Sequence, residues 1–317
     1  MGPGGTIALL FALVAIGYLL AWRGVLREGA GEALGDFVVA VAIPALLFRT
    51  LAEADFEGAR PLALWAVYFA TIATVWTLAT LAIRRGFARD ARAGVVAGLA
   101  ASFSNLVLLG IPVILALFGR EGTEILSLLI AVHLPVMMAA SLVLHERAER
   151  LDGTRESGAG AAALARRFVV SMGTNPIIAG IVLGLLWRLS PFALPTFVAE
   201  LVDRLAGVAG TLALIALGTS LRRFGIARNL PQASVTAALK LLLMPAVATL
   251  LALTAGLPST VAQIVVVCAA MPAGVNPYLI AARLGTGEAL ASNTLLIATA
   301  LSPVTLLGWA WVARVVF

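Results

Sequence analysis

Two apolar stretches of the chain are interrupted by glycine and proline: GIPVILALFG (110–119), which follows Ser104-Asn105, and MPAGVNPYLIA (271–281). Proline removes a backbone donor and clashes with the preceding turn, so a helix that contains it loses backbone hydrogen bonds. In the hydrocarbon of a bilayer, such groups are tolerated only where protein or a water-filled cavity covers them. Paired interruptions at corresponding positions of two halves indicate the binding site of a transporter.

The composition is that of a membrane protein. Hydrophobic residues make up 61% of the 317 positions, charged residues make up 12%, and the mean hydropathy is +1.03. A soluble domain carries about 25% charged residues. Apolar runs of about 20 residues, long enough to span a bilayer, recur along the chain. The single cysteine, Cys268, excludes an intramolecular disulfide and a thiolate metal cluster. We therefore expect an all-α integral membrane protein.

The hydropathy pattern predicts ten membrane spans. They lie at about 6–22, 34–52, 61–83, 93–118, 124–145, 172–189, 196–221, 231–255, 259–283 and 289–315. The stretch 146–170 is the least hydrophobic and is the only connection long enough to be a linker. It separates a first half, 1–145, from a second half, 171–317.

The arginines lie mainly in short loops between spans, which is how a membrane protein fixes its orientation. If the N-terminus is outside, the odd-numbered loops are cytoplasmic and hold most of the 22 basic residues. We therefore expect a multi-pass protein of the cytoplasmic membrane with both termini outside. The same distribution argues against nucleic acid as the partner of a chain with net charge +6.

The two halves resemble each other in sequence. LLFRTLAEADFEGARP (46–61) aligns without gaps on ALGTSLRRFGIARNLP (216–231), so that Pro61 falls on Pro231. Because each half has an odd number of spans, the halves enter the membrane from opposite sides. The prediction is a five-plus-five inverted repeat in which spans four and nine are discontinuous, a plan that many secondary transporters share.

Asn105 and Asn276 lie beside the interruptions, where their amides could join exposed backbone groups in a substrate site. A nearby N-terminus of a half-helix would favour an anionic group through its dipole and free N–H groups. The alternative is that each asparagine only satisfies carbonyls that the neighbouring proline frees.

Three further polar residues within spans are candidates for charge or proton coupling: His133, Lys240 and Gln263. Histidine titrates near neutral pH, which suits proton coupling, but a structural histidine bonded to a carbonyl explains His133 equally well. Lys240 lies too deep in its span to reach either interface easily. It is therefore a candidate fixed charge for an anion, or a titrating group.

Several signals are missing from the chain. No Asp or Glu lies near mid-membrane depth, and no GxxxxGKS loop, HExxH motif, acidic metal-binding pair or TVGYG filter occurs. We therefore expect no enzyme activity, no ATP-driven transport, no cofactor and no bound metal.

Five motifs follow one another over nearly the whole chain: SNLVLLGIPVILALFG (104–119), NPIIAGIVLGLL (175–186), LALIALGTSL (212–221), LKLLLMPAV (239–247) and AAMPAGVNPYLIAARLG (269–285). Together they resemble the auxin efflux carrier family, a relative of the bile acid:sodium symporters. The resemblance implies ten helices in two inverted repeats, with helices four and nine crossing at their prolines. It also implies a scaffold of spans one, two, six and seven, a mobile core of the other six, elevator-type alternating access, and homodimers formed through the scaffold.

The resemblance implies a substrate site at the positions that correspond to the crossover of that family. These are Asn105, Pro112, Pro272, Asn276 and Pro277, with the nearby residues Ser104, Gly110 and Gly274. Family substrates are small organic anions, so we expect a secondary transporter of a carboxylate such as an auxin-like or dicarboxylic acid. Coupling to H+ or Na+ stays open. The alternatives are a sodium-coupled symporter similar to those of bile acids, or a membrane sensor of the same fold.

Overall fold

The computed structural model describes residues 2–27, 29–56, 58, 60–154, 166, 168–170, 172–224 and 229–317. Within these residues all regular secondary structure is helical, which confirms the expected all-α class, and the only β-type pairing is an isolated bridge between Ser104 and Ala273. The chain divides into two compact units. The first unit comprises Met1–Gly58, Val107–Val132 and Ala165–Arg223, and the second comprises Ala59–Leu106, His133–Leu164 and Phe224–Phe317.

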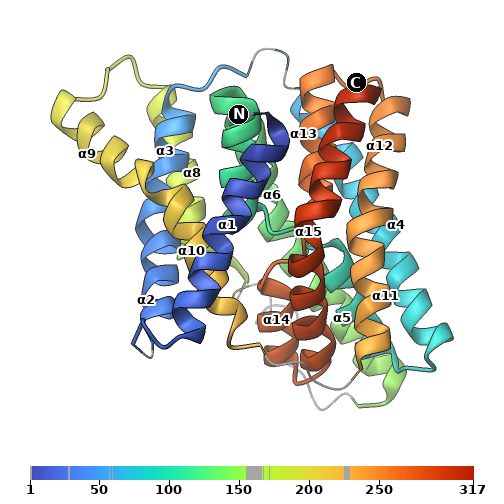
Figure 1. Cartoon of the computed structure of the whole chain (residues 1–317). Helices are drawn as coiled ribbons and strands as arrows, with labels where there is room; N and C mark the ends of the chain where they lie inside the picture. Colours follow the sequence, from blue (N-terminus) through green and yellow to red (C-terminus); the bar gives the residue numbers. More distant parts are fainter. Residues whose placement is uncertain are drawn as a thin grey trace. The chain divides into compact units, whose positions relative to one another are not determined.

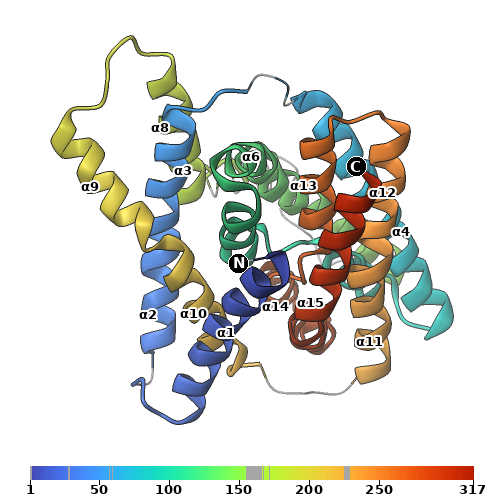
Figure 2. The ribbon, with the colours of Figure 1, turned by 45° about the horizontal axis from the view of Figure 1, so that its top comes forward.

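The first unit is built from helix pairs. Its elements are α1 (Pro3–Trp22), α2 (Ala30–Phe37), the π-helical segment η1 (Val38–Ala42), α3 (Ile43–Ala52), α8 (Pro176–Arg188), α9 (Thr196–Gly207) and α10 (Ala209–Leu221). It also holds most of the π-helical segment η2 (Leu106–Gly110) and the start of α6 (Ile111–Asp152). Within this unit α1 lies along α10 and α3 lies along α8 (Figures 1 and 2).

Small residues let the backbones of these pairs approach closely. A Cβ atom added to Gly180 of α8 would lie 2.6 Å from the backbone oxygen of Pro44, and one added to Gly184 would lie 2.8 Å from that of Phe48. Gly180 and Gly184 form a GxxxG pattern, which is typical of close helix packing in membranes, where apolar side chains gain little by leaving lipid. The glycines therefore set how closely α8 packs on α3.

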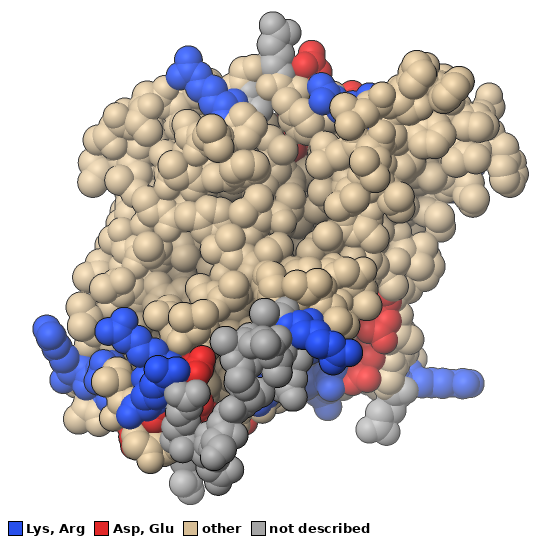
Figure 3. Space-filling model, turned by 180° about the vertical axis from the view of Figure 1, so that it is seen from behind, with Lys and Arg blue, Asp and Glu red and all other residues tan. Residues whose placement is uncertain are grey.

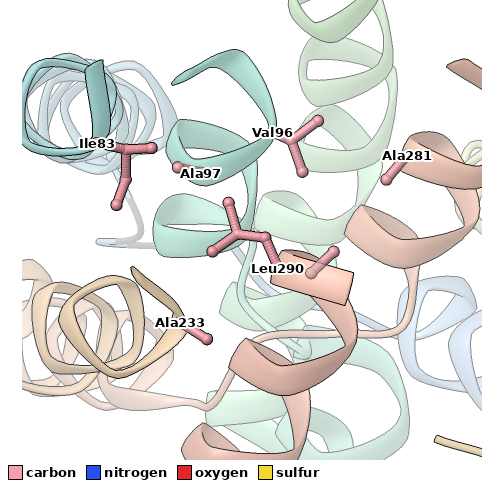
Figure 4. Packing of buried hydrophobic residues seen from close by; sticks show 7 residues of the cluster. Ile83, Val96, Ala97, Ala233, Ala281 and Leu290 are labelled. Atoms are coloured by element: carbon pink, nitrogen blue, oxygen red, sulfur yellow. The ribbon is translucent and has the colours of Figure 1, made fainter. Parts of the chain in front are cut away.

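The second unit contains the interrupted helices. Its elements are α4 (Pro61–Gly86), α5 (Ala91–Ser102), α11 (Leu230–Ala238), the π-helical segment η3 (Leu239–Leu243), α12 (Met244–Thr254), α13 (Ser259–Ala270), α14 (Asn276–Leu284) and α15 (Glu288–Val316). Within this unit α4 packs on α5, α11 on α15, and α12 on α13. Figure 4 shows one buried cluster, which brings α5, α11, α14, α15 and the end of α4 together. Its labelled residues are Ile83, Val96, Ala97, Ala233, Ala281 and Leu290.

Three π-helical segments each end two residues before a proline. They are η1 before Pro44, η2 before Pro112 and η3 before Pro245. Proline cannot donate to the carbonyl four residues earlier and its ring clashes with that group, and a widened turn before it relieves this clash. Widened turns of this kind are frequent at functional sites.

Seven helical segments are long and apolar enough to cross a membrane: Pro3–Trp22, Ala30–Ala52, Pro61–Gly86, Leu106–Asp152, Thr196–Leu221, Leu230–Thr254 and Glu288–Val316. Among the described residues, the apolar helices of 10–17 residues are Ala91–Ser102, Pro176–Arg188 and Ser259–Ala270. On the face drawn in Figure 3, charged side chains gather at the helix ends and a wide uncharged surface lies between them. The ten-span inverted repeat stays a prediction.

The longest segment contains a sharp change of direction at one glycine. Gly119, within α6, has φ 63° and ψ −149°, values that no helix contains and that favour glycine. The sequence predicts a boundary between spans 93–118 and 124–145 at this point. In the structure two helical stretches join at Gly119 in a kink, without a loop between them.

Candidate functional site

Both interrupted helices end in extended backbone inside the second unit. Helix α5 begins at the cap Asp90, whose carboxylate accepts a hydrogen bond from Ala93 N, and it ends at Ser102 before extended Phe103. Helix α13 ends at Ala270, Met271 has φ −58° and ψ 143°, and the chain resumes as α14 at Asn276. We call residues 103–105 the first break and residues 271–275 the second break.

The two breaks satisfy each other's backbone groups. The Asn105 N–H donates to the carbonyl oxygen of Pro272 at 2.9 Å, and the Gly274 N–H donates to that of Phe103 at 3.2 Å. Ser104 and Ala273 form the antiparallel bridge between these two bonds. A buried backbone polar group without a partner is costly in an apolar medium, so this pairing makes both interruptions tolerable at once.

Lys240 lies beside this pairing and is completely buried. Its ammonium nitrogen lies 2.9 Å from Ser104 Oγ, 2.7 Å from the carbonyl oxygen of Ala269 and 3.0 Å from Met244 Sδ. An ammonium group has three donors, and here each has an acceptor. Lys240 is also the only lysine of the chain.

His133 is 3% exposed and lies among aromatic rings. Its ring centroid is 4.7 Å from that of Phe103, in an edge-on arrangement, and 5.7 Å from that of Tyr68. Neither Nδ1 nor Nε2 has a hydrogen-bond partner among the described residues. Among the described residues no carbonyl accepts a hydrogen bond from either nitrogen, so a role of His133 in proton coupling and a structural role both stay predictions.

The structure brings several of the predicted site residues together and leaves others apart. Ser104, Asn105, Pro272, Gly274 and Lys240 are all buried at or against the breaks. The packing of the two breaks does not require a glycine at position 274. A Cβ atom added there would lie 3.6 Å from Asn105 Cα, which is an ordinary van der Waals contact.

The remaining candidates lie outside this group. Asn276 and Pro277 form the first turn of α14, where Asn276 is half-buried and Pro277 is buried. Gln263 lies on α13 away from the break, 3.4 Å from Ser259 Oγ. Gly110 and Pro112 belong to the first unit, so the crossing of two prolines stays a prediction.

Three residues of this site were missed by the sequence reasoning: Tyr68, Phe103 and Met244. Phe103 directly precedes the Ser104-Asn105 pair, and Met244 lies four residues after Lys240, a spacing at which helical side chains meet. Both could have been found from spacing alone. Tyr68 carries no local signal, and its ring centroid lies 5.7 Å from that of His133.

A separate charged cluster lies within the first unit. Arg49 pairs with Glu53 and with Asp203, and Arg120 pairs with Glu53 and Glu124. Most of these side chains are substantially exposed, so the cluster contributes little to stability. Among the described residues, no group of three His, Cys, Asp or Glu side chains is arranged to hold a metal ion.

Comparison with known proteins gives a consistent result. Residues 5–310 match the model of a family described as membrane transport protein. An uncharacterized transporter of Methanothermobacter thermautotrophicus is 28% identical over 314 residues, which covers 98% of each chain. A putative malonate transporter of Rhizobium meliloti is 27% identical over 325 residues, which covers 98% of this chain and 95% of that protein. An uncharacterized transporter of Methanocaldococcus jannaschii is 22% identical over 318 residues.

Proposed function

Since the chain belongs to the membrane transport protein family, the auxin efflux carrier family that its motifs resemble, we propose that it is a secondary transporter of a small carboxylate across the cytoplasmic membrane. The observation that carries the proposal is the pairing of the two breaks, Asn105 N to Pro272 O and Gly274 N to Phe103 O. Interrupted helices at depth are the feature on which secondary transporters build substrate sites.

The groups around the breaks suit a carboxylate. Asn276 opens α14, so its amide lies at a helix N-terminus, where the dipole and free N–H groups favour negative charge. Asn105 contributes a second amide on the other break. The charge of buried Lys240 makes the surroundings positive, and α4, α5, α12, α13 and α14 contain no Asp or Glu. The anion is thus held by amides and backbone donors in a positive field.

A dicarboxylate of malonate size is the leading candidate substrate. The relative from Rhizobium meliloti carries the name of a malonate transporter, and its similarity extends over nearly the whole of both chains. The membrane potential alone can drive export of such an anion from a negative interior, since each charge is worth about 2.3 kcal/mol per 100 mV.

The proposed mechanism is elevator-type alternating access. The protein would have ten helices in two inverted repeats, with a scaffold of spans one, two, six and seven. The mobile core of the other six spans would carry the crossover site from one side of the membrane to the other. The proposal includes a homodimer formed through the scaffold and an orientation with both termini outside. Its support is the family membership and the internal sequence similarity of 46–61 with 216–231.

A binding screen on purified protein tests the proposed site. Short mono- and dicarboxylates and indole acids are titrated with and without Na+ at two pH values. Asn276→Ala should weaken binding of the best ligand at least about tenfold, because a hydrogen bond to a charged group is worth about 1.5–3 kcal/mol. The matched control is Asn175→Ala, since Asn175 caps α8 by accepting from Ile177 N at 2.9 Å. Equal affinity in both variants would refute the assignment of Asn276.

A further inference from the structure

The only lysine of the chain, Lys240, bonds both the first break and the last turn of α13. We propose that Lys240 is a positioning residue that fastens the ends of α5 and α13 to each other, and that it is not a ligand of the substrate anion. Its bond to Ser104 Oγ reaches the first break, and its bond to the carbonyl oxygen of Ala269 reaches the last turn of α13. The consequence for transport rests on the function proposed above, but the fastening itself does not.

The donor geometry supports this assignment. An ammonium group can donate three hydrogen bonds, and Lys240 Nζ has three acceptors within 3.0 Å: Ser104 Oγ, Ala269 O and Met244 Sδ. A carboxylate could bind Nζ directly only if one of these acceptors were released. Because the Ala269 carbonyl is buried with its residue, releasing it would leave a polar group without a partner.

The charge explains why a lysine suits this position. Hydrogen bonds from a charged donor are shorter and stronger than those between neutral groups, so one ammonium can hold two backbone segments that no helix connects. No carboxylate lies in η3, α5, α12 or α13, the elements that carry these contacts or lead into the first break. An anion at the neighbouring amides would be attracted through space without touching Nζ.

The local backbone directs the lysine toward the breaks. Lys240 lies in η3, the widened turn that precedes Pro245. Met244, one turn further along, covers the third donor of the ammonium group. The path of the helix through this widened turn brings Nζ to the first break and to the last turn of α13.

Hydrogen exchange of backbone amides in the ligand-free protein tests the proposal. Lys240→Met keeps the length of the side chain and removes all of its donors. The amides of Asn105 and Gly274, which pair the breaks, should then exchange at least about tenfold faster relative to the amides in the middle of α13, because local opening becomes easier. Unchanged relative exchange at these two amides would overturn the proposal.

Two further variants keep the result interpretable. Trp309→Phe is the matched control, because the Trp309 indole donates to the carbonyl oxygen of Leu241 in the same η3 segment without touching a break. It should leave the relative exchange of Asn105 and Gly274 unchanged. If Lys240→Met does not fold, Ser104→Ala removes one acceptor only and should give a smaller increase at the same amides. The absence of that increase would also overturn the proposal.

Ligand binding separates this proposal from the function on which it rests. If the wild-type protein binds no carboxylate but exchange accelerates in Lys240→Met, the proposed function fails and the fastening role stands. If Lys240→Met loses carboxylate binding while exchange at the breaks is unchanged, Lys240 contacts the anion and the fastening role is overturned. The fastening role predicts that accelerated exchange and weakened binding occur together.

Discussion

The indole nitrogen of Trp309 donates a hydrogen bond of 2.9 Å to the backbone oxygen of Leu241, four residues before Pro245. That carbonyl is the one that a regular helix would pair with residue 245, and proline has no N–H to offer. A side chain from α15 therefore supplies the missing donor for η3. In a membrane, where water is scarce, a proline is tolerated when a neighbouring helix satisfies the freed group in this way.

Trp309→Phe should lower the stability of the second unit. The substitution keeps an aromatic ring but leaves the Leu241 carbonyl without its donor, which costs about 1–3 kcal/mol. Thermal unfolding in detergent measures the effect. If Trp309→Phe unfolded at the same temperature as the wild-type protein, the Leu241 carbonyl would have another donor and this prediction would fail.

Gly180→Ala should destabilise the first unit by about 1–3 kcal/mol, because the new methyl group would overlap the backbone of Pro44 and push α8 away from α3. Gly35→Ala on α2 is the matched control. Nothing lies within 4 Å of a Cβ at Gly35, and alanine favours a helix over glycine by up to about 1 kcal/mol. Thermal unfolding of the two variants should therefore shift in opposite directions. A shift of both variants in the same direction would contradict the packing described here.

The sequence alone indicated the class of the fold and, from its glycine and prolines, the interruption at 271–275. Of the two breaks, only this one lies where an interruption was expected, whereas the break at 103–105 contains neither glycine nor proline and precedes the interruption expected at 110–119. Their mutual hydrogen bonds could not be predicted, since a contact between Asn105 and Pro272 leaves no periodic signal in either segment. The widened turns before Pro44, Pro112 and Pro245 do not follow from proline alone, because Pro135 and Pro303 lie inside α6 and α15 without such a segment.

Two polar residues show where sequence reasoning stops. Lys240 was expected as a charge facing a substrate or as a titrating group, but its three acceptors come from segments that only the tertiary structure brings together. His133 was expected either to couple protons or to bond a carbonyl. The choice depends on the direction of one ring, which the rings of Phe103 and Tyr68 determine in the folded protein.

His133→Gln should flatten the pH dependence of transport between about pH 5 and pH 8, the range in which histidine changes its charge. The imidazole is buried without a hydrogen-bond partner among the described residues, so a protonated ring requires a partner that the transport cycle brings to it. His145→Gln is the matched control, because His145 already pairs with Glu149 at 3.4 Å. Rates measured across this range should lose their slope only in His133→Gln. An identical profile in that variant and the wild type would exclude proton coupling through His133.

Binding of the carboxylate should not require Na+. A sodium site at broken helices needs oxygen ligands such as free backbone carbonyls, but the ammonium group of Lys240 already uses the Ala269 carbonyl, and the helices at the breaks contain no Asp or Glu. Affinities measured in Na+ and in choline at equal ionic strength should agree. At least about tenfold tighter binding in Na+ would favour the sodium-coupled alternative instead.

The central claim is that the paired breaks hold a carboxylate that the protein carries across the membrane. The most direct test is uptake of radiolabelled malonate and other short carboxylates into proteoliposomes whose interior is made positive. Saturable uptake should grow with the imposed potential, and it should be lost in Asn276→Ala but kept in Asn175→Ala. Uptake of every carboxylate at the level of protein-free vesicles, or equal uptake of a neutral amide analogue, would contradict it.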